Sequence, residues 1–103
     1  MRHLQDKVKN FCEQHNLSKS VEARFLDVVS ELGELAKEIL LNSNYGKKTI
    51  ENSERLEEEI GDTIFSLIAL SNSVDIDMEV ALDKVLKKYE SRSNNGSIGS
   101  VQT

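Results

Sequence analysis

The chain has 103 residues, of which 38% are hydrophobic and 30% charged, and its formal net charge is −5. This length fits one domain with a modest core, and an acidic chain without a long basic run is not expected to bind a nucleic-acid polymer. No apolar run is long enough to span a bilayer, and the first residues lack the apolar segment of a signal peptide. The single cysteine, Cys12, cannot form an internal disulfide. We therefore expect a cytoplasmic protein with no membrane partner.

Helical spacing of apolar residues dominates the chain, which contains no proline. In the first expected helix, Val8 and Phe11 fall on one apolar face. The turn "NLSKS" follows this helix, and further helix caps are expected at Ser53 and at Asp75 or Asp77. The predicted helices cover about residues 2–15, 21–41, 54–74 and 78–92.

These elements predict an all-α fold, a four-helix bundle with two long central helices. Residues 1–92 form the predicted helical domain. Residues 93–103 are poor in apolar side chains and are expected to form a flexible C-terminal tail. Because a domain of this size buries a modest core, we expect association with further subunits to contribute to its stability.

Two short acidic motifs stand out within the two central helices. "ELGE" spans Glu31–Glu34 and "EIGD" spans Glu59–Asp62, so each motif places an acid, an apolar residue, a glycine and an acid in the same order. Residues three apart lie on neighbouring turns of one helical face. At about 100° per residue, each acid pair lies at the edge of the apolar stripe of its helix. Helices that pack through these stripes would bring both pairs together at one margin of the core.

Four carboxylates at such a margin would repel one another, and partial desolvation would raise their pKa values or destabilise the fold. A hard divalent cation removes this difficulty. Mg²⁺ takes oxygen ligands and is often completed by substrate phosphates, and a ligand set without histidine or cysteine favours Mg²⁺ or Mn²⁺ over zinc. The pattern therefore predicts that Glu31, Glu34, Glu59 and Asp62 hold Mg²⁺, with Mn²⁺ as a substitute.

A solvated helix surface is the alternative interpretation of these acids, and either motif alone would favour it. Glycine inside a helix costs about 1 kcal/mol relative to alanine. Its presence between the acids of both motifs, at Gly33 and Gly61, indicates close approach by another backbone or by a ligand. The repetition in matching phase favours the metal site over the solvated surface.

The two motifs resemble those of the MazG-like family of all-α nucleoside triphosphate pyrophosphohydrolases, whose mark is E-x-x-E on one helix and E-x-x-D on the next. "SELGELAKEIL" carries Glu31 and Glu34, and "ERLEEEIGDTIFSLIAL" carries Glu59 and Asp62. The resemblance covers about residues 4–92. It implies Mg²⁺-dependent cleavage of a (d)NTP between the α- and β-phosphates, which releases a (d)NMP and pyrophosphate and serves nucleotide-pool house-cleaning. It also implies a homo-oligomer, dimer or tetramer, with sites near subunit interfaces.

A basic segment near the end of the chain extends the resemblance. In "KKYESR", Lys88, Tyr89 and Arg92 match the family's phosphate-contacting lysine, aromatic and arginine positions. The resemblance implies that Lys88 and Arg92 contact substrate phosphates. Lys84 follows the same (i, i+4) spacing on one ridge of the last helix and is a further candidate for phosphate binding. An ordinary basic surface near a helix C-terminus is the alternative interpretation.

Two acids of the second helix have further expected roles. Glu34 is the candidate general base that orients the attacking water. Glu38 is a candidate to support the metal ligands, with a solvated carboxylate as the equal alternative. The chain departs from many relatives at Leu86, where asparagine is common, and at Ser30, where an additional glutamate often precedes the first motif. These departures bear on substrate recognition more than on the metal site.

Hydrolysis is the leading functional prediction, and two alternatives stand beside it. A non-hydrolytic helical module that senses nucleotide or metal through a protein partner would bind nucleotide without forming product. A plain helical interaction protein would leave the acids solvated and would bind no Mg²⁺.

Overall fold

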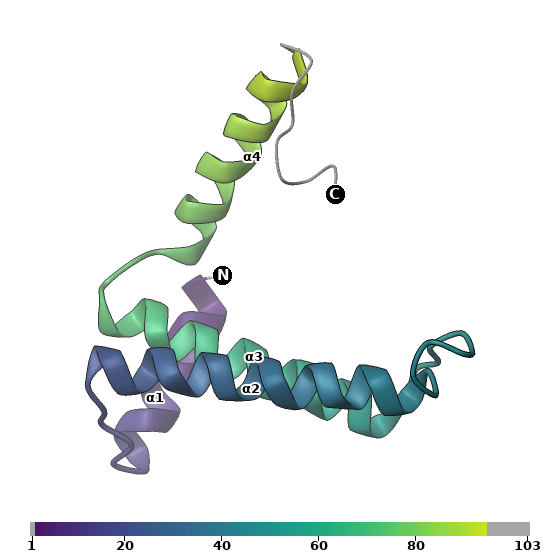
Figure 1. The fold of residues 1–103 in the computed structure, drawn as a ribbon. Helices are drawn as coiled ribbons and strands as arrows, with labels where there is room; N and C mark the ends of the chain where they lie inside the picture. The colour runs from purple at the N-terminus through teal and green to yellow at the C-terminus, as the bar shows by residue number, and fades with distance from the viewer. Residues whose placement is uncertain (1, 95–103) are drawn as a thin grey trace.

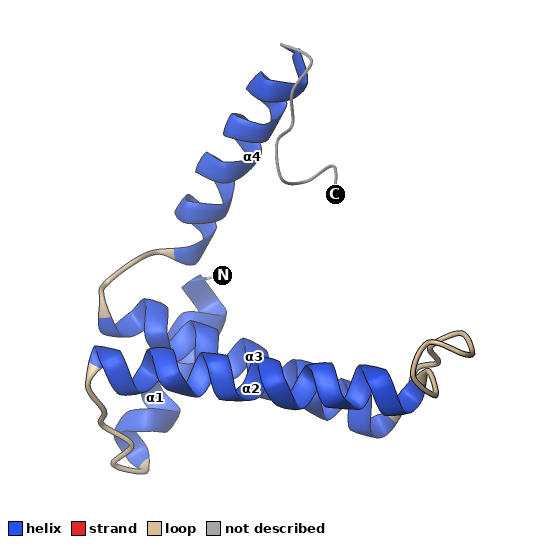
Figure 2. Cartoon of the chain, in the orientation of Figure 1, coloured by secondary structure: helices blue, strands red, loops and turns tan. Residues whose placement is uncertain are grey.

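A computed structural model describes residues 2–94 of the chain. These residues form four helices joined by turns and loops, with no strand among them (Figure 2), so the predicted all-α fold class is confirmed. The helices are α1 (Arg2–Gln14), α2 (Val21–Asn42), α3 (Glu54–Ser73) and α4 (Met78–Asn94). The predicted C-terminal tail lies outside the described residues, except for residues 93 and 94, which belong to α4.

Short polar side chains fix where the helices begin. The Ser20 hydroxyl accepts a hydrogen bond from the amide three residues on, at 3.1 Å, and the Ser53 hydroxyl does the same for α3 at 3.0 Å. Of the two aspartates expected to cap the fourth helix, Asp77 is the cap, because its carboxylate accepts hydrogen bonds from the amides two and three residues on. Each cap satisfies amides that have no partner inside the helix.

The two long helices form an antiparallel pair. In Figure 1, α2 and α3 lie side by side along most of their lengths and are joined by the loop at their far end. Val28 of α2 and Ile68 and Ala69 of α3 are buried. Helix α1 packs against α3, where the rings of Phe11 and Phe65 meet edge to face with centroids 6.0 Å apart. The α2–α3 pair is therefore the rigid frame from which the site is built.

A buried polar residue, Gln5, joins α1 to the turn between α3 and α4. It is only 2% exposed. Its amide nitrogen donates to Asn72 Oδ1 at 3.0 Å and to the Ile76 carbonyl at 2.8 Å, and its amide oxygen accepts from the Met78 amide at 2.9 Å. The Asn72 amide donates back to the Gln5 carbonyl at 3.0 Å. These bonds fix the direction in which α4 leaves the molecule.

Helix α4 projects away from the α2–α3 pair (Figure 1). As a result, much apolar surface stays exposed in the single chain, including Phe25 at 54% and Phe11, which helical phase places on an apolar face, at 46%. The larger exposed apolar side chains of α2, α3 and α4 include Leu26, Val29, Leu32, Leu40, Ile60, Ile64, Leu67, Val80, Leu82 and Leu86. Within the described part of the chain, none of the helices combines the length and the hydropathy that a bilayer span requires.

Candidate metal centre

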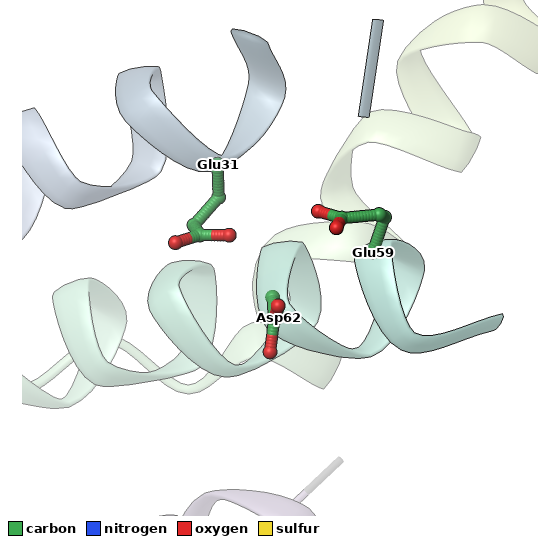
Figure 3. Close-up of side chains that lie close together, drawn as sticks. All are labelled: Glu31, Glu59 and Asp62. Atoms are coloured by element: carbon green, nitrogen blue, oxygen red, sulfur yellow. The ribbon is translucent and has the colours of Figure 1, made fainter. Parts of the chain in front are cut away.

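Three of the predicted ligands come together between α2 and α3. Glu31 extends from α2 toward α3, and Glu59 and Asp62 lie three residues apart on α3 (Figure 3). Each residue offers one carboxylate oxygen, and these three oxygens all lie within 4.8 Å of one another. This spacing suits three ligands around one small cation, and the donors are the hard oxygens that Mg²⁺ and Mn²⁺ prefer.

The positions of these acids follow from the packing of the hairpin. Residues three apart lie on neighbouring turns of one face, so Glu59 and Asp62 present their carboxylates together. The antiparallel course of α2 brings Glu31 opposite them. Glu31 and Glu59 are half-buried, whereas Asp62 is exposed. The site therefore lies at the margin of the helix pair, open to solvent on one side.

The electrostatics of the site are unfavourable for a fully ionised set of acids. Burial raises the pKa of Glu31 above its ordinary value of 4.5, and the negative charges of Asp62 and Glu59 raise it further. Smaller contributions come from Glu34 and Asp27 on the same helix. A cation at this position would relieve the repulsion that these charges exert on one another.

Glu34, the fourth predicted ligand, is exposed and lies outside the group of three. It is near enough for its charge to raise the pKa of Glu31. Its position one turn along α2 leaves its carboxylate facing solvent at the edge of the site. Its roles as ligand and as general base stay predictions.

Glu38 contacts a different part of α3. Its side chain is buried, with the residue 8% exposed, and its Oε1 pairs with Nε of Arg55 at 3.1 Å. Arg55 lies in the first turn of α3, so this ion pair ties the C-terminal half of α2 to the start of α3. Glu38 thus holds the two helices that carry the acids rather than contacting the acids directly. Sequence analysis did not identify Arg55, and its place near a helix start among several glutamates gave no signal for it.

The predicted phosphate-binding residues lie on α4. Lys84, Lys88 and Arg92 are all exposed on this helix, which projects away from the α2–α3 pair. Lys88 Nζ lies 5.6 Å from the centroid of the Tyr89 ring, and Arg92 Cζ lies 6.0 Å from it. The aromatic ring therefore groups two of the three cations into one positive patch.

The two motif glycines have open space beside them. A Cβ atom at Gly33 or at Gly61 would have no neighbouring heavy atom within 4 Å beyond its own helix backbone. The close approach that their sequence positions indicated is therefore not made by the described part of this chain. The space is available to a ligand or to another subunit.

Residues 19–97 match the family model of the MazG nucleotide pyrophosphohydrolase domain. The matched residues include both acid motifs and the basic segment of α4. The chain belongs to this family. Family membership agrees with the resemblance that the motifs carry, and it places Glu31, Glu59 and Asp62 within the matched domain.

Individual relatives agree with this assignment. YpjD of Bacillus subtilis is 45% identical over 71 residues, which make up 66% of the chain and 62% of YpjD. The Gene 37 protein of Mycobacterium phage L5 is 31% identical over 75 residues, or 71% of the chain and 66% of that protein. In sequence, the chain thus spans slightly less than two thirds of the curated relatives it matches. A crystal structure of B. subtilis YpjD, described as a candidate pyrophosphatase, superposes with a TM-score of 0.73 at 38% identity and covers 89% of this chain and 94% of that one.

Proposed function

We propose that this protein is a Mg²⁺-dependent nucleoside triphosphate pyrophosphohydrolase that cleaves the α–β bond of a (d)NTP. The products are a (d)NMP and pyrophosphate, and the expected role is house-cleaning of the nucleotide pool. The observation that carries the proposal is the convergence of three carboxylate oxygens within 4.8 Å on the two helices of a MazG-family domain. Such a chain is a hydrolase of phosphoric anhydrides by its family.

The donor set fits Mg²⁺. Glu31, Glu59 and Asp62 offer three hard oxygen ligands, and Mg²⁺ in proteins is usually held by a few carboxylates together with waters and substrate phosphates. When bound, the ion neutralises charge, polarises phosphate oxygens and lowers the pKa of a coordinated water. The pKa of Glu31 is raised first by burial and then by the charges of Asp62 and Glu59, and a bound cation would favour the ionised form of this carboxyl group.

The remaining groups of the chain supply orientation and proton transfer. Glu34 is exposed beside the three acids, where its carboxylate is suited to accept the proton of the attacking water. Lys88 and Arg92, with Lys84, bind phosphate oxygens and compensate charge on the leaving pyrophosphate. Glu38 keeps α2 and α3 in register through its ion pair with Arg55.

The course of α4 supports a homo-oligomer, a dimer or a tetramer. Because α4 projects away from the α2–α3 pair, we expect its cations to reach the acids of another copy rather than those of their own chain. Many large apolar side chains of α2, α3 and α4 are exposed, and extended exposed apolar surface is typical of interaction sites. A second copy would cover this surface and complete the site at the interface.

A nucleotide panel with both products quantified tests the proposal. Purified protein is incubated with each canonical and modified (d)NTP in the presence of Mg²⁺ or Mn²⁺, and monophosphate and pyrophosphate are measured in parallel. Equal amounts of the two products, abolished by a chelator, support the proposal. Orthophosphate alone, or no product with any nucleotide, contradicts it, and saturable nucleotide binding without product would favour the non-hydrolytic sensing module.

A further inference from the structure

A separate cavity lies between α1, the loop that joins α1 to α2, and the C-terminal end of α3. Its volume is about 500 Å³, which is within the range of roughly 300–1,000 Å³ found for small-molecule sites. None of Glu31, Glu59 and Asp62 lines it. The cavity is therefore separate from the candidate metal centre.

Arg24, in the first turn of α2, is the most deeply buried charged residue of the cavity lining. It is 8% exposed, and one of its guanidinium nitrogens donates a hydrogen bond to the Leu17 carbonyl. No carboxylate within residues 2–94 forms an ion pair with it. Buried charges are normally paired, because moving a charged group out of water without a counter-charge costs on the order of several kcal/mol.

The other donors of Arg24 point to where a counter-charge would sit. A guanidinium carries five N–H donors, and the Leu17 carbonyl accepts from one nitrogen only. In the described part of the chain, no fully buried side-chain nitrogen or oxygen lacks a hydrogen-bond partner. The remaining guanidinium nitrogens therefore keep accessible surface, and the cavity that Arg24 lines is the adjoining space.

The other cations of the lining differ in whether they are already paired. Lys19 Nζ is bound to Asp27 at 2.8 Å, and Arg2 lies 3.5 Å from Asp77. Lys9 lines the cavity without an ion pair of this kind and adds positive charge beside Arg24. This arrangement leaves two cations of the lining available to an anionic ligand.

Three acids also lie on the cavity lining, namely Asp6, Glu13 and Asp75. All three are exposed to solvent, where water and salt screen their charges. Arg24 is only 8% exposed, so water and salt screen its charge less than they screen the charges of the acids. The acids lower the affinity for an anion, and the buried guanidinium determines where the anion binds.

We propose that this cavity is a binding site for a small organic anion, whose carboxylate or phosphate head pairs with Arg24. The guanidinium fork matches either oxyanion. The cavity is larger than the head requires, so the body of the ligand lies against the apolar part of the lining, which includes Cys12, Leu17 and Ala69. Arg24 precedes Glu31 by seven residues, or about 10 Å along α2, so the anion site is distinct from the candidate metal centre.

Chemical-shift titrations of the full chain test this proposal. The ¹⁵N-labelled protein is titrated, in the presence of a chelator, with benzoate, with phenyl phosphate and with neutral benzyl alcohol. Without divalent metal, the acid cluster repels anions, so the result does not depend on the proposed hydrolase activity. We expect saturable shifts near residues 12, 17, 24 and 69 with at least one anion and none with the alcohol. The anion that binds more tightly identifies the preferred head.

Substitutions at Arg24 give the decisive comparison. R24Q is expected to weaken binding by about tenfold or more, because hydrogen bonds to a charged group are lost. R24K keeps the charge, loses the fork and should fall between R24Q and the unaltered chain, whereas Lys87→Gln, on the exposed surface of α4, should bind normally. If R24Q fails to fold, the comparison of R24K with the unaltered chain decides the matter. The proposal is overturned if neither anion gives saturable shifts, or if binding is unchanged in the folded Arg24 variants.

Discussion

The carboxylate oxygens of Glu31 on α2 and Glu59 on α3 lie within 4.8 Å of each other, and Asp62 meets both within the same distance. Two antiparallel helices of one chain are thus sufficient to gather three negative charges at one point. Burial, followed by the negative charges of Asp62 and Glu59, raises the pKa of Glu31, so ionisation of this carboxyl group is disfavoured in the folded chain.

Glu59→Gln should abolish turnover while leaving the helix content nearly unchanged. The substitution keeps the shape of the side chain and removes one anionic ligand. We therefore expect activity to fall at least about 100-fold, which is more than the loss usually seen when a residue that only supports a metal ligand is replaced. Activity and far-ultraviolet circular dichroism are measured together. Glu58→Gln, at the neighbouring exposed residue outside the cluster, serves as the matched control. Loss of helical structure in the Glu59 variant would mean that the residue is structural.

The contribution of Glu31 to the stability of the metal-free protein should fall as the pH rises through the folded-state pKa of this residue. That pKa lies above the ordinary value of 4.5, so the folded state binds this proton more tightly than the unfolded state does. The stabilising contribution is complete below 4.5 and is lost as Glu31 ionises.

Glu31→Gln should therefore raise the melting temperature of the chelated protein at neutral pH and leave it nearly unchanged under acidic conditions. With Mg²⁺ present, the order should reverse, because the variant has lost a ligand. Differential scanning calorimetry over a pH series, with and without Mg²⁺, measures both effects. A lower melting temperature for the chelated variant at neutral pH would show that Glu31 stabilises the fold for another reason.

Gly61→Ala should stabilise the metal-free chain and impair catalysis. The added methyl group meets no neighbour within 4 Å, and alanine in a helix interior is favoured over glycine by about 1 kcal/mol. The same methyl group occupies space that we assign to a ligand or another subunit. Urea denaturation and turnover are measured on the same preparation, with Gly33→Ala as a companion variant. A destabilised chain with full activity would contradict both parts of this prediction.

Leu86→Ser should shift the protein toward smaller assemblies. Leu86 is 54% exposed on α4, and its burial by another copy would remove apolar surface from water. Sedimentation velocity over a concentration series gives the distribution of species. Lys87→Ser changes an exposed polar neighbour on the same helix and should leave the assembly intact. An unaltered chain that remains monomeric at every concentration would contradict the proposed homo-oligomer.

Gln5→Leu should loosen the junction between α3 and α4. The substitution removes a hydrogen-bond partner from Asn72 Oδ1, the Ile76 carbonyl and the Met78 amide, which are partly buried, and each such loss costs up to roughly 1–3 kcal/mol, depending on how far water can replace the partner. We expect a lower free energy of unfolding and faster hydrogen exchange at the start of α4. Gln14→Leu replaces an exposed glutamine of the same helix and should have little effect. Unchanged exchange at the Met78 amide would show that other contacts hold α4.

Local patterns in the sequence predicted the parts of the structure that depend on one helix or on one pair of helices. Ser53 was predicted as a cap, and Asp77 as one of two candidates beside Asp75, because short polar side chains satisfy unpaired amides. The acids of α2 and α3 were placed on matching edges because helical phase is set by residue spacing. Once the two stripes pack, Glu31 must lie opposite Glu59 and Asp62.

The features that sequence analysis missed depend on contacts between distant segments. Gln5 reads as a surface residue of α1, and its burial follows only from partners at positions 72, 76 and 78. The outward course of α4 depends on the same contacts, so helical phase alone could not reveal that α4, which carries Lys88 and Arg92, projects away from the α2–α3 pair. The exposure of Phe25 has a similar origin, because an apolar stripe does not specify whether its partner is the same chain or another copy.

Anomalous diffraction from crystals grown with Mn²⁺ and a non-hydrolysable nucleoside triphosphate analogue tests the central claim most directly. The account predicts a manganese peak between Glu31, Glu59 and Asp62, with carboxylate oxygens at about 2.0–2.2 Å and the analogue's phosphates on the same ion. An analogue bound elsewhere, or crystals in which these carboxylates hold no ion while the nucleotide is fully bound, would contradict it.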